Sequence, residues 1–370
     1  MRDSSGQEIW IGSETQCYMQ FEYHTGIQRV IRETHEHLFD FLSCHGIQLG
    51  WCRTQDTAAS NIFLNNDYLA ADPVLRNGEV PLGECPVVIF LDLNTSIDFS
   101  RLATEKKESG KTYIFMIHDL LPIQISSVPP QASFQFRIYL QQVLHLADHI
   151  VVTTEKVRND LLDLSWHTKA EIHIIHLGTS LPTQTSVAIP RQQISLMYVS
   201  TIEPRKGHDL LLDTFDLLLE SGIDVDLNLI GRYGWDREQL QARILGHAEF
   251  GSRLRWRSSA DDYELRAVAR KCNIGVFPTE DEGFGLFVEE GLSLGLNMVV
   301  SDIPEFRERA GSGVYFSGTD PAELAARIIE AREEWGSADS MRQVRSMQDF
   351  AHDLTTLILA EVEKRKVTCV

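Results

Sequence analysis

The stretch with the densest chemistry runs from Thr279 to Gly295 and reads TEDEGFGLFVEEGLSLG. Three acids lead into Gly-Phe-Gly, and an apolar, helix-like run with two more glutamates follows. Carboxylates before a helix are stabilised by its dipole by about 0.3–1 kcal/mol, which explains acidity here without any function. The glycines need another explanation, because each lowers helix propensity by roughly 1 kcal/mol. A bare backbone at a helix start is suited to close contact with a ligand.

Two acids of this stretch are candidates for ligand contact. Glu282 precedes the expected helix start, and Glu290 lies about two turns further on. We expect the other acids, Glu280, Asp281 and Glu289, to be solvated. One face of the helix should be buried, at the i, i+3, i+4 and i+7 positions Val288, Gly291, Leu292 and Gly295.

A second candidate segment is STIEPRKGHDLLLDTF, residues 200–215. Arg205 and Lys206 lie between the end of an expected strand and an expected helix. Two adjacent cations beside the free N–H groups of a helix start are suited to a diphosphate. A solvated, charged turn is an equally natural interpretation of this segment alone.

Three further segments place glycine or histidine between a strand and a helix. Gly231 and Gly234 flank a turn in LIGRYGW, where Arg232 could reach a nucleotide, although an ordinary turn is favoured. His118 ends the expected strand of FMIHDLLP, and hydrogen bonding within the fold is its alternative role. Gly26 precedes an amphipathic helix, where it could contact an anion or simply form a turn.

These residues need elements that bring them to one edge of a sheet. Short apolar strands alternate with amphipathic helices along the chain, which is typical of parallel α/β sheets covered on both faces. In such sheets ligands bind outside the carboxyl ends of the strands, where the candidate residues fall. The expected helices include 207–222 and 236–251, and the expected strands are 86–93, 112–119, 149–154, 171–178, 194–201, 225–231, 253–257, 274–279 and 297–302.

The segment 180–193, SLPTQTSVAIPRQQ, has two prolines and no apolar period, which is typical of a linker. The sequence therefore predicts an α/β protein with two doubly wound, Rossmann-like domains, 1–185 and 186–340. Two such domains would face each other across a central cleft, a usual place for a substrate.

Composition excludes several classes of protein. The 370 residues are 43% hydrophobic and 24% charged, as in globular proteins of two domains. The net charge of −19, without any long basic run, argues against nucleic acid as a partner. The six cysteines lack metal-binding spacing and are expected to be reduced thiols. No apolar run is long enough for a membrane span and the N-terminus has no signal-peptide core, so we expect a cytoplasmic protein.

Taken together, these segments resemble the retaining glycosyltransferases of the GT-B fold, in particular their large fourth sequence family. The resemblance covers most of the chain and is strongest from about 195 to 330. EGFGLFVEE is similar to that family's signature of two glutamates separated by seven residues, and EPRKG to its diphosphate-binding segment. SDIPEFRE and GTDPAELAARI are similar to later segments. TGIQRVIRE resembles the glycine-containing first loop of a bacterial mannosyltransferase-like subset of the family. HDLLP resembles the family's segment that carries a histidine in the cleft.

The resemblance implies a role for each candidate residue. Arg205 and Lys206 would neutralise the donor diphosphate, and Gly26 would offer it a backbone N–H. His118 would contact the sugar from the first domain. The catalytic set is thus His118, Glu282, Arg205 and Lys206.

The remaining candidates would bind the donor. Glu282 would hydrogen-bond sugar hydroxyls beside the backbone that follows it, and Glu290 would accept hydrogen bonds from the ribose. The donor-binding set is Gly26, Gly231, Arg232, Gly283, Phe284, Gly285, Leu286 and Glu290. Three places depart from the family pattern. Thr201 stands near a usual arginine, Phe287 replaces a common proline, and SLGLNMV replaces a pattern of small residues, Gly and Pro, although Gly295 remains.

The implied activity is hexosyl transfer with retention, from a nucleoside diphosphate sugar to a hydroxyl of a glycan or lipid-linked acceptor. Mannose from GDP-mannose is favoured, in bacterial surface polysaccharide synthesis, and no metal or other cofactor is expected. A nucleotide-sugar epimerase or hydrolase on the same fold, and a non-catalytic binding partner, are the alternatives. The final helix, about 340–366, should pack back on the first domain.

The segment 133–147, SFQFRIYLQQVLHLA, is expected to be a core helix. Its alternative is a surface helix that makes a weak peripheral contact at the inner face of a membrane. No feature of the sequence indicates a particular oligomeric state.

Overall fold

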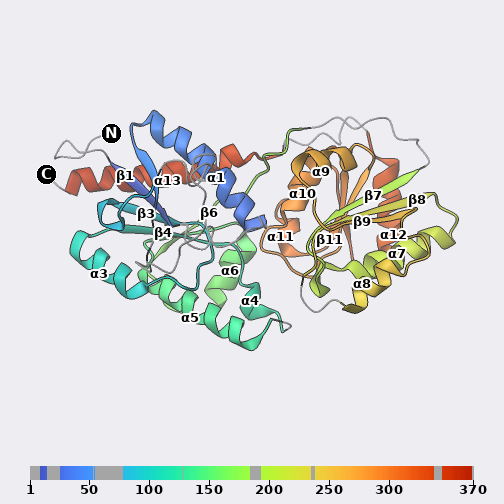
Figure 1. Cartoon of the computed structure of the whole chain (residues 1–370), viewed down its shortest axis with the longest axis horizontal. Coiled ribbons are helices and arrows are strands. Elements are labelled where there is room, and N and C mark those ends of the chain that lie inside the picture. The colour runs from blue at the N-terminus through green and yellow to red at the C-terminus, as the bar shows by residue number, and fades with distance from the viewer. Residues whose placement is uncertain are drawn as a thin grey trace. The chain divides into compact units, whose positions relative to one another are not determined.

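The computed structural model describes residues 9–14, 26–52, 54, 78–126, 128–183, 193–234, 238–336 and 344–368 (Figure 1). The chain divides into two compact units, residues 1–180 with 346–370 and residues 181–345. The predicted boundaries were 185 and 340. Most of the predicted linker, residues 184–192, lies outside the described part of the chain.

The first unit contains a parallel six-stranded sheet in the order β2-β1-β3-β4-β5-β6. Its strands β3, β4 and β5 are buried throughout and apolar except for their first residues in β4 and β5, because helices cover both faces. The strands are β1 (Trp10–Glu14), β2 (Gln48–Cys52), β3 (Val87–Phe90), β4 (Thr112–Ile117), β5 (His149–Val152) and β6 (Glu171–Ile174).

The helices of this unit are α1 (Gly26–Cys44), α3 (Phe99–Ser109), α4 (Leu121–Gln124), α5 (Pro130–Leu146), α6 (Glu155–Asp163) and α13 (Met347–Thr368), with the 3-10 turn η2 (Leu82–Glu84). The C-terminal helix α13 packs against α1 and contacts β3, as Figure 1 shows. Its Arg365 guanidinium lies 3.3 Å from Thr112 Oγ1 at the start of β4.

Helix α5 covers the segment for which a membrane contact was the alternative. It buries Phe136, Tyr139 and Leu140 in the core of the first unit, as expected of a core helix. Phe134 and Ile138 on the same helix are 63% and 45% exposed. Within the described residues, every helix is too short or too polar to cross a membrane.

The second unit repeats the architecture, with a parallel sheet in the order β12-β11-β10-β7-β8-β9. The strands are β7 (Ile194–Val199), β8 (Val225–Ile230), β9 (Leu254–Arg257), β10 (Ile274–Phe277), β11 (Asn297–Ser301) and β12 (Val314–Ser317). The helices are α7 (His208–Glu220), α8 (Glu238–Leu245), α9 (Asp262–Ala269), α10 (Leu286–Ser293), α11 (Pro304–Arg307) and α12 (Pro321–Glu333), with the 3-10 turn η3 (Pro204–Lys206).

Each sheet has a point where the winding of the chain reverses. In the first sheet β2 and β3 flank β1, and in the second β8 and β10 flank β7. The loops after the carboxyl ends of the two strands at such a switch point diverge to opposite faces and leave a crevice for ligands. The switch points therefore lie at β1/β3 and β7/β10.

The predicted α/β class with doubly wound sheets is confirmed, and every expected strand is present with slightly different ends. Three strands were missed. Polar residues and glycines interrupt β1 (WIGSE) and β2 (QLGWC), and β12 (VYFS) is only partly buried, so none has a continuous apolar run.

Candidate active site

The predicted cations and the first predicted glutamate meet at the switch point of the second unit. Arg205 and Lys206 lie in η3, directly after β7, and Glu282 lies in the loop after β10. Lys206 Nζ forms an ion pair with Glu282 Oε1, and Arg205 donates to the same oxygen from 3.2 Å. Residues 76 and 77 positions apart in sequence are thus brought into contact by two adjacent parallel strands.

The Glu282 carboxylate is 7% exposed and remains charged. Burial alone would raise its pKa, but Lys206 and Arg205 outweigh that cost and lower the pKa below its ordinary value. Thr279 Oγ1 adds a hydrogen bond to the carboxylate at 3.3 Å. The site therefore holds two cations and one anion in a fixed arrangement.

Both cations are positioned by further contacts. Arg205 donates to the Asp281 carbonyl oxygen at 2.8 Å, and its Nε lies 3.3 Å from the Glu203 carboxylate. The Lys206 ammonium lies 5.4 Å from the centre of the Phe277 ring, and the Tyr198 hydroxyl donates to the Lys206 carbonyl. Glu203 was missed as a site residue, although it stands beside the cations in EPRK.

The Gly-Phe-Gly turn is explained in part by packing. Gly285 precedes α10 with a left-handed φ of 77°, and a Cβ there would lie 2.6 Å from Phe306 Cε1. A side chain is thus disfavoured at Gly285 by the fold itself, whatever the ligand. Gly283 and Phe284 are buried beside it.

Arg309 anchors this turn and was missed by the sequence analysis. It is 8% exposed, its NH1 group pairs with the Glu289 carboxylate at 3.0 Å, and it donates to the Phe284 carbonyl. Its guanidinium also lies 3.7 Å from the centre of the Phe284 ring. The expectation that Glu289 is solvated is wrong. Glu289 is 4% exposed, and its carboxylate pairs with Arg309 next to the Gly-Phe-Gly turn.

The remaining acids of the stretch divide by exposure. Glu280 is exposed and Asp281 is half-buried, as solvated residues are. Glu290 lies within α10 and is 8% exposed. The Glu282 backbone N–H donates to Glu305 Oε1 at 2.8 Å, which fixes the loop from the α11 side.

Helix α10 does not bury a single stripe. Every residue from Phe287 to Ser293 is buried, and the helix ends before Gly295, which lies outside it. The prediction of one buried face is therefore wrong, because the helix is enclosed on all sides. Leu286, its first residue, is half-buried.

Gly231 and Arg232 lie after β8, next to the loop of the cations. The Ile202 N–H donates to the Arg232 carbonyl at 3.0 Å, and a Cβ on Gly231 would lie 1.7 Å from the Ser200 carbonyl oxygen. The glycine is thus required by backbone packing. The Arg232 side chain is exposed beside this loop.

His118 lies in the first unit, in the loop after β4. Its Nε2–H donates to the Leu91 carbonyl at 2.7 Å, which leaves Nδ1 as an acceptor. Burial lowers the pKa of His118 below its ordinary value, and this hydrogen bond and Asp92 offset the effect only in part. His118 is thus a neutral, fixed imidazole at the carboxyl edge of the sheet.

Other polar groups gather at the same edge of the first sheet. Glu14 ends β1 and accepts a hydrogen bond from Asn94 Nδ2 at 3.2 Å, which joins the end of β1 to the loop after β3. Both residues are buried, and the sequence analysis missed both. Gly26 begins α1, a helix without acidic residues in its first turn. Thr25 lies outside the described residues.

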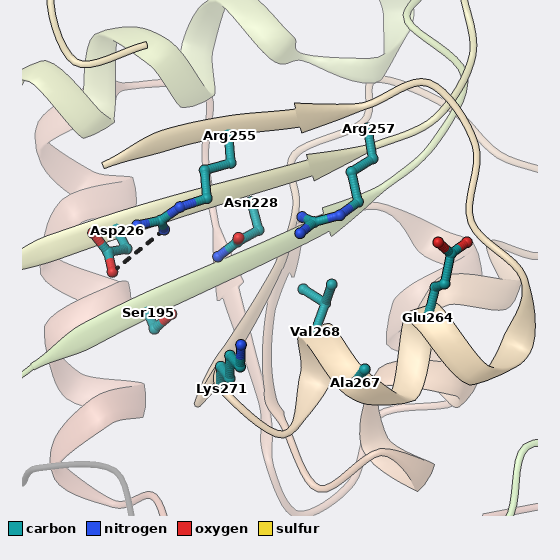
Figure 2. Close-up of a pocket in the computed structure, with 9 residues that line it drawn as sticks. All are labelled: Ser195, Asp226, Asn228, Arg255, Arg257, Glu264, Ala267, Val268 and Lys271. Atoms are coloured by element: carbon teal, nitrogen blue, oxygen red, sulfur yellow. Dashed lines mark ion pairs between the residues drawn. The ribbon is translucent and has the colours of Figure 1, made fainter. Parts of the chain in front are cut away.

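A pocket of about 400 Å³ lies elsewhere in the second unit, between the sheet and α9. Figure 2 shows Arg255 and Arg257 of β9 on one side of it and Lys271, which follows α9, on the other. Arg255 pairs with Asp226 at 3.6 Å. None of the predicted site residues lines this pocket.

Comparison with known proteins finds a family model that matches most of the second unit and relatives that match more of the chain. The family model described as glycosyl transferases group 1 matches residues 193–334. Serotype-specific mannosyltransferase WbdA of Escherichia coli is 27% identical over 349 residues, which are 85% of this chain and 40% of that protein. The D-inositol 3-phosphate glycosyltransferase of Thermobispora bispora is 25% identical over 243 residues, 60% of this chain and 57% of that protein. The chain thus spans about two fifths of the length of the WbdA relatives.

Solved structures share the fold at low sequence identity. Sucrose-phosphate synthase from Thermosynechococcus elongatus superposes with a TM-score of 0.67 at 16% identity, covering 98% of this chain and 100% of that one. Anabaena HepE in complex with UDP and glucose gives a TM-score of 0.65 at 12% identity, covering 94% and 98%. The predicted GT-B fold and the predicted likeness to bacterial mannosyltransferases are confirmed.

Proposed function

We propose that this chain, whose residues 193–334 form a glycosyl transferases group 1 domain, moves a sugar from a nucleoside diphosphate sugar to an acceptor hydroxyl with retention. The observation that carries the proposal is the contact of Arg205, Lys206 and Glu282 at the β7/β10 switch point. Fixed cations in that place are suited to the diphosphate of a donor.

Breaking the glycosyl–phosphate bond places negative charge on the leaving diphosphate. Stabilising that charge is the main electrostatic task of the site, and groups fixed before the reaction do it with little reorganisation. Lys206 and Arg205 are held by Glu282, Glu203 and the Asp281 carbonyl, so their positions are set in advance. A diphosphate would share or replace the Glu282 carboxylate as their partner.

The sugar would lie beside Glu282 and the Gly-Phe-Gly backbone. Glu282 remains charged and accepts hydrogen bonds, which sugar hydroxyls can donate. Arg309 and Phe306 hold Phe284 and Gly285 in place beneath the sugar. Glu290 would accept from the ribose hydroxyls.

Two groups of the first unit would also take part. His118 would contact the sugar, and the N-terminus of α1 at Gly26 would contact the diphosphate. Neutral His118 offers Nδ1 as an acceptor, because its Nε2–H is committed to Leu91. No side chain is assigned as general base. The leaving phosphate would help to deprotonate the acceptor on the same face of the sugar.

The reaction needs no metal in this proposal. The acidic residues nearest to these cations are 280–282, and the Glu282 carboxylate is already paired with both cations, so it is a poor ligand for a divalent ion. The charge that a metal would supply in other enzymes comes here from Arg205 and Lys206.

Mannose is the favoured sugar and GDP-mannose the favoured donor, with a glycan or lipid-linked acceptor of a bacterial surface polysaccharide. Support comes from the relatives whose names read serotype-specific mannosyltransferase and O-antigen chain mannosyltransferase B. The latter is 28% identical over 160 residues, 42% of this chain and 40% of that protein. The protein would act in the cytoplasm or at the inner face of the membrane.

The proposal is tested by measuring thermal stability with GDP-, UDP- and dTDP-sugars, followed by transfer of labelled sugar to a mannose-containing acceptor. GDP-mannose should raise the melting temperature most and support transfer. Stabilisation by no nucleotide sugar would contradict the proposal. Turnover of the donor without any acceptor would favour the epimerase or hydrolase alternative instead.

A further inference from the structure

A cluster of two histidines and a glutamate lies at the amino edge of the first sheet, on β5 and β6. His149 is the first residue of β5 and stands beside Glu171, the first residue of β6. His173 lies two positions along β6, so it shares a face with Glu171. The predicted site residues lie in the loops and helices that follow the carboxyl ends of strands, so this cluster is not part of that site.

The potential ligand atoms are spaced as metal ligands are. His149 Nδ1 lies 3.0 Å from His173 Nε2. Glu171 Oε2 lies 3.7 Å from His149 Nδ1 and 3.8 Å from His173 Nε2. Ligand atoms about 2.1 Å from a tetrahedral metal stand about 3.4 Å from one another. Shifts of a few tenths of an ångström would bring all three atoms to that spacing.

A second, independent feature orients the buried histidine. His149 is 4% exposed, and its Nε2 lies 3.2 Å from Oε1 of Glu361, which is itself 8% exposed on α13. A carboxylate on the far nitrogen of a histidine is the usual arrangement around metal-binding imidazoles. Glu361 accepts the Nε2–H, so the lone pair of Nδ1 points into the cluster.

We propose that His149 Nδ1, His173 Nε2 and the Glu171 carboxylate bind a divalent transition-metal ion of the zinc type. Two imidazoles and one carboxylate suit Zn²⁺, whereas Mg²⁺ and Ca²⁺ prefer oxygen ligands alone. The side chain of Glu171 is 68% exposed and that of His173 30%, so an ion can enter from solvent and keep water as its fourth ligand.

The bound ion would act as a structural clip. It would join β5 to β6 directly and, through His149 and Glu361, fix both strands to α13. Because α13 follows the second unit in sequence, the clip would tie the returning helix to the first unit. The metal would raise the stability of the fold and take no part in sugar transfer.

The test uses the full chain, stripped of metal with EDTA and then titrated with ZnCl₂ by calorimetry and with CoCl₂ by visible absorption. Wild type should bind one more equivalent of Zn²⁺ than His173→Ala, and its Co²⁺ complex should show the d–d bands of a tetrahedral site. Zn²⁺ should raise the melting temperature of wild type and leave that of His173→Ala unchanged.

Two variants sharpen the assignment. Glu361→Gln removes the charge of the orienting group, which also pairs with Lys364, and should weaken Zn²⁺ binding by about 10–100-fold, as loss of such partners usually does. His145→Ala removes an exposed histidine of the same unit and should bind as wild type does. Glu171→Gln, at an exposed position, replaces His173→Ala should the latter fail to fold.

Equal stoichiometry and affinity in wild type, His173→Ala and Glu171→Gln would overturn the proposal. The same holds for a wild type whose melting temperature is indifferent to both Zn²⁺ and EDTA. The cluster would then be a hydrogen-bonded histidine pair only.

Discussion

The two sheets present opposite chemistry at their switch points. At β7/β10 the loops hold Arg205, Lys206 and Glu282 in one ion-paired group. At β1/β3 the last residue of β1, Glu14, pairs with Asn94 of the loop after β3, and the neighbouring loop after β4 holds the neutral ring of His118. One fold, used twice in the chain, thus holds two adjacent cations at the switch point of the second unit and a glutamate–asparagine pair at that of the first.

Under the proposed function, this difference would give the side chains of the two units separate tasks. Cations in the second unit suit the charge of a diphosphate, whose negative charge grows as the sugar leaves. Neutral and acceptor groups in the first unit suit hydroxyls, which need orientation more than charge. Substitutions in the second unit should therefore cost more activity than substitutions in the first.

Lys206→Met should give the largest effect. It removes one fixed cation from the leaving group and leaves Glu282 with Arg205 as its remaining cation, so kcat/KM for the donor should fall by about 10²–10³-fold. Steady-state kinetics measure this, with circular dichroism to confirm folding. Lys271→Met, an exposed lysine of the same unit, is the matched control and should change little. Near wild-type turnover by Lys206→Met would refute the site assignment.

Arg309→Met should have the next largest effect, because Arg309 holds the Gly-Phe-Gly loop in position. The change breaks a buried ion pair with Glu289 and frees the Phe284 carbonyl, so the free energy of unfolding should fall by about 3–5 kcal/mol. Urea denaturation measures the loss. The double variant Arg309→Met/Glu289→Leu should recover part of the stability, because no buried charge is then left alone. An unchanged denaturation midpoint in the single variant would show that Arg309 does not hold the loop.

Gly285→Ala should have a smaller effect on stability. A residue with a side chain in this left-handed conformation lowers the stability of the fold by roughly 1–2 kcal/mol. The new methyl group would also contact the Phe306 ring. The double variant Gly285→Ala/Phe306→Leu helps to separate the two causes, since it removes the closest contact, leaves the one with Phe277 at 3.0 Å and leaves the strain. If Gly285→Ala is as stable as wild type and only donor binding is lost, the glycine serves the ligand rather than the fold.

The smallest effect is a pH dependence in the first unit. The pKa of His118 is lowered by burial, so the unfolded chain binds a proton there before the folded chain does. Stability from this group is therefore complete above the unfolded pKa of about 6.5 and decreases as pH falls toward the folded value. An NMR titration of the imidazole should give a midpoint below 6.5, and His118→Gln should remove this part of the pH dependence. A midpoint above 6.5 would contradict the neutral ring.

The sequence predicted the switch-point chemistry because strand ends are visible in it. EPRKG and TEDEG both follow apolar runs, and parallel strands bring their carboxyl ends to one edge. It could not predict the Lys206–Glu282 contact itself, which requires that β7 and β10 be neighbours although two strands separate them in the chain.

Buried polar partners were the main omission. Arg309 and Glu289 lie 20 residues apart in the sequence. The residues next to each of them give no sign that the charge is buried. Only the folded structure shows that both are buried, Glu289 in the enclosed helix α10 and Arg309 beside it. In the same way, β1 has too few apolar residues to be recognised alone, which hid Glu14 and its bond to Asn94.

The central claim is that the β7/β10 switch point binds a nucleoside diphosphate through Arg205 and Lys206. Isothermal titration of GDP and of UDP into wild type, Lys206→Met and Lys271→Met tests it most directly. We predict saturable binding of at least one nucleotide to wild type and Lys271→Met, and binding at least about tenfold weaker to Lys206→Met, as loss of a charge-assisted contact requires. Equal affinity in all three proteins, or no binding to wild type, would contradict the account.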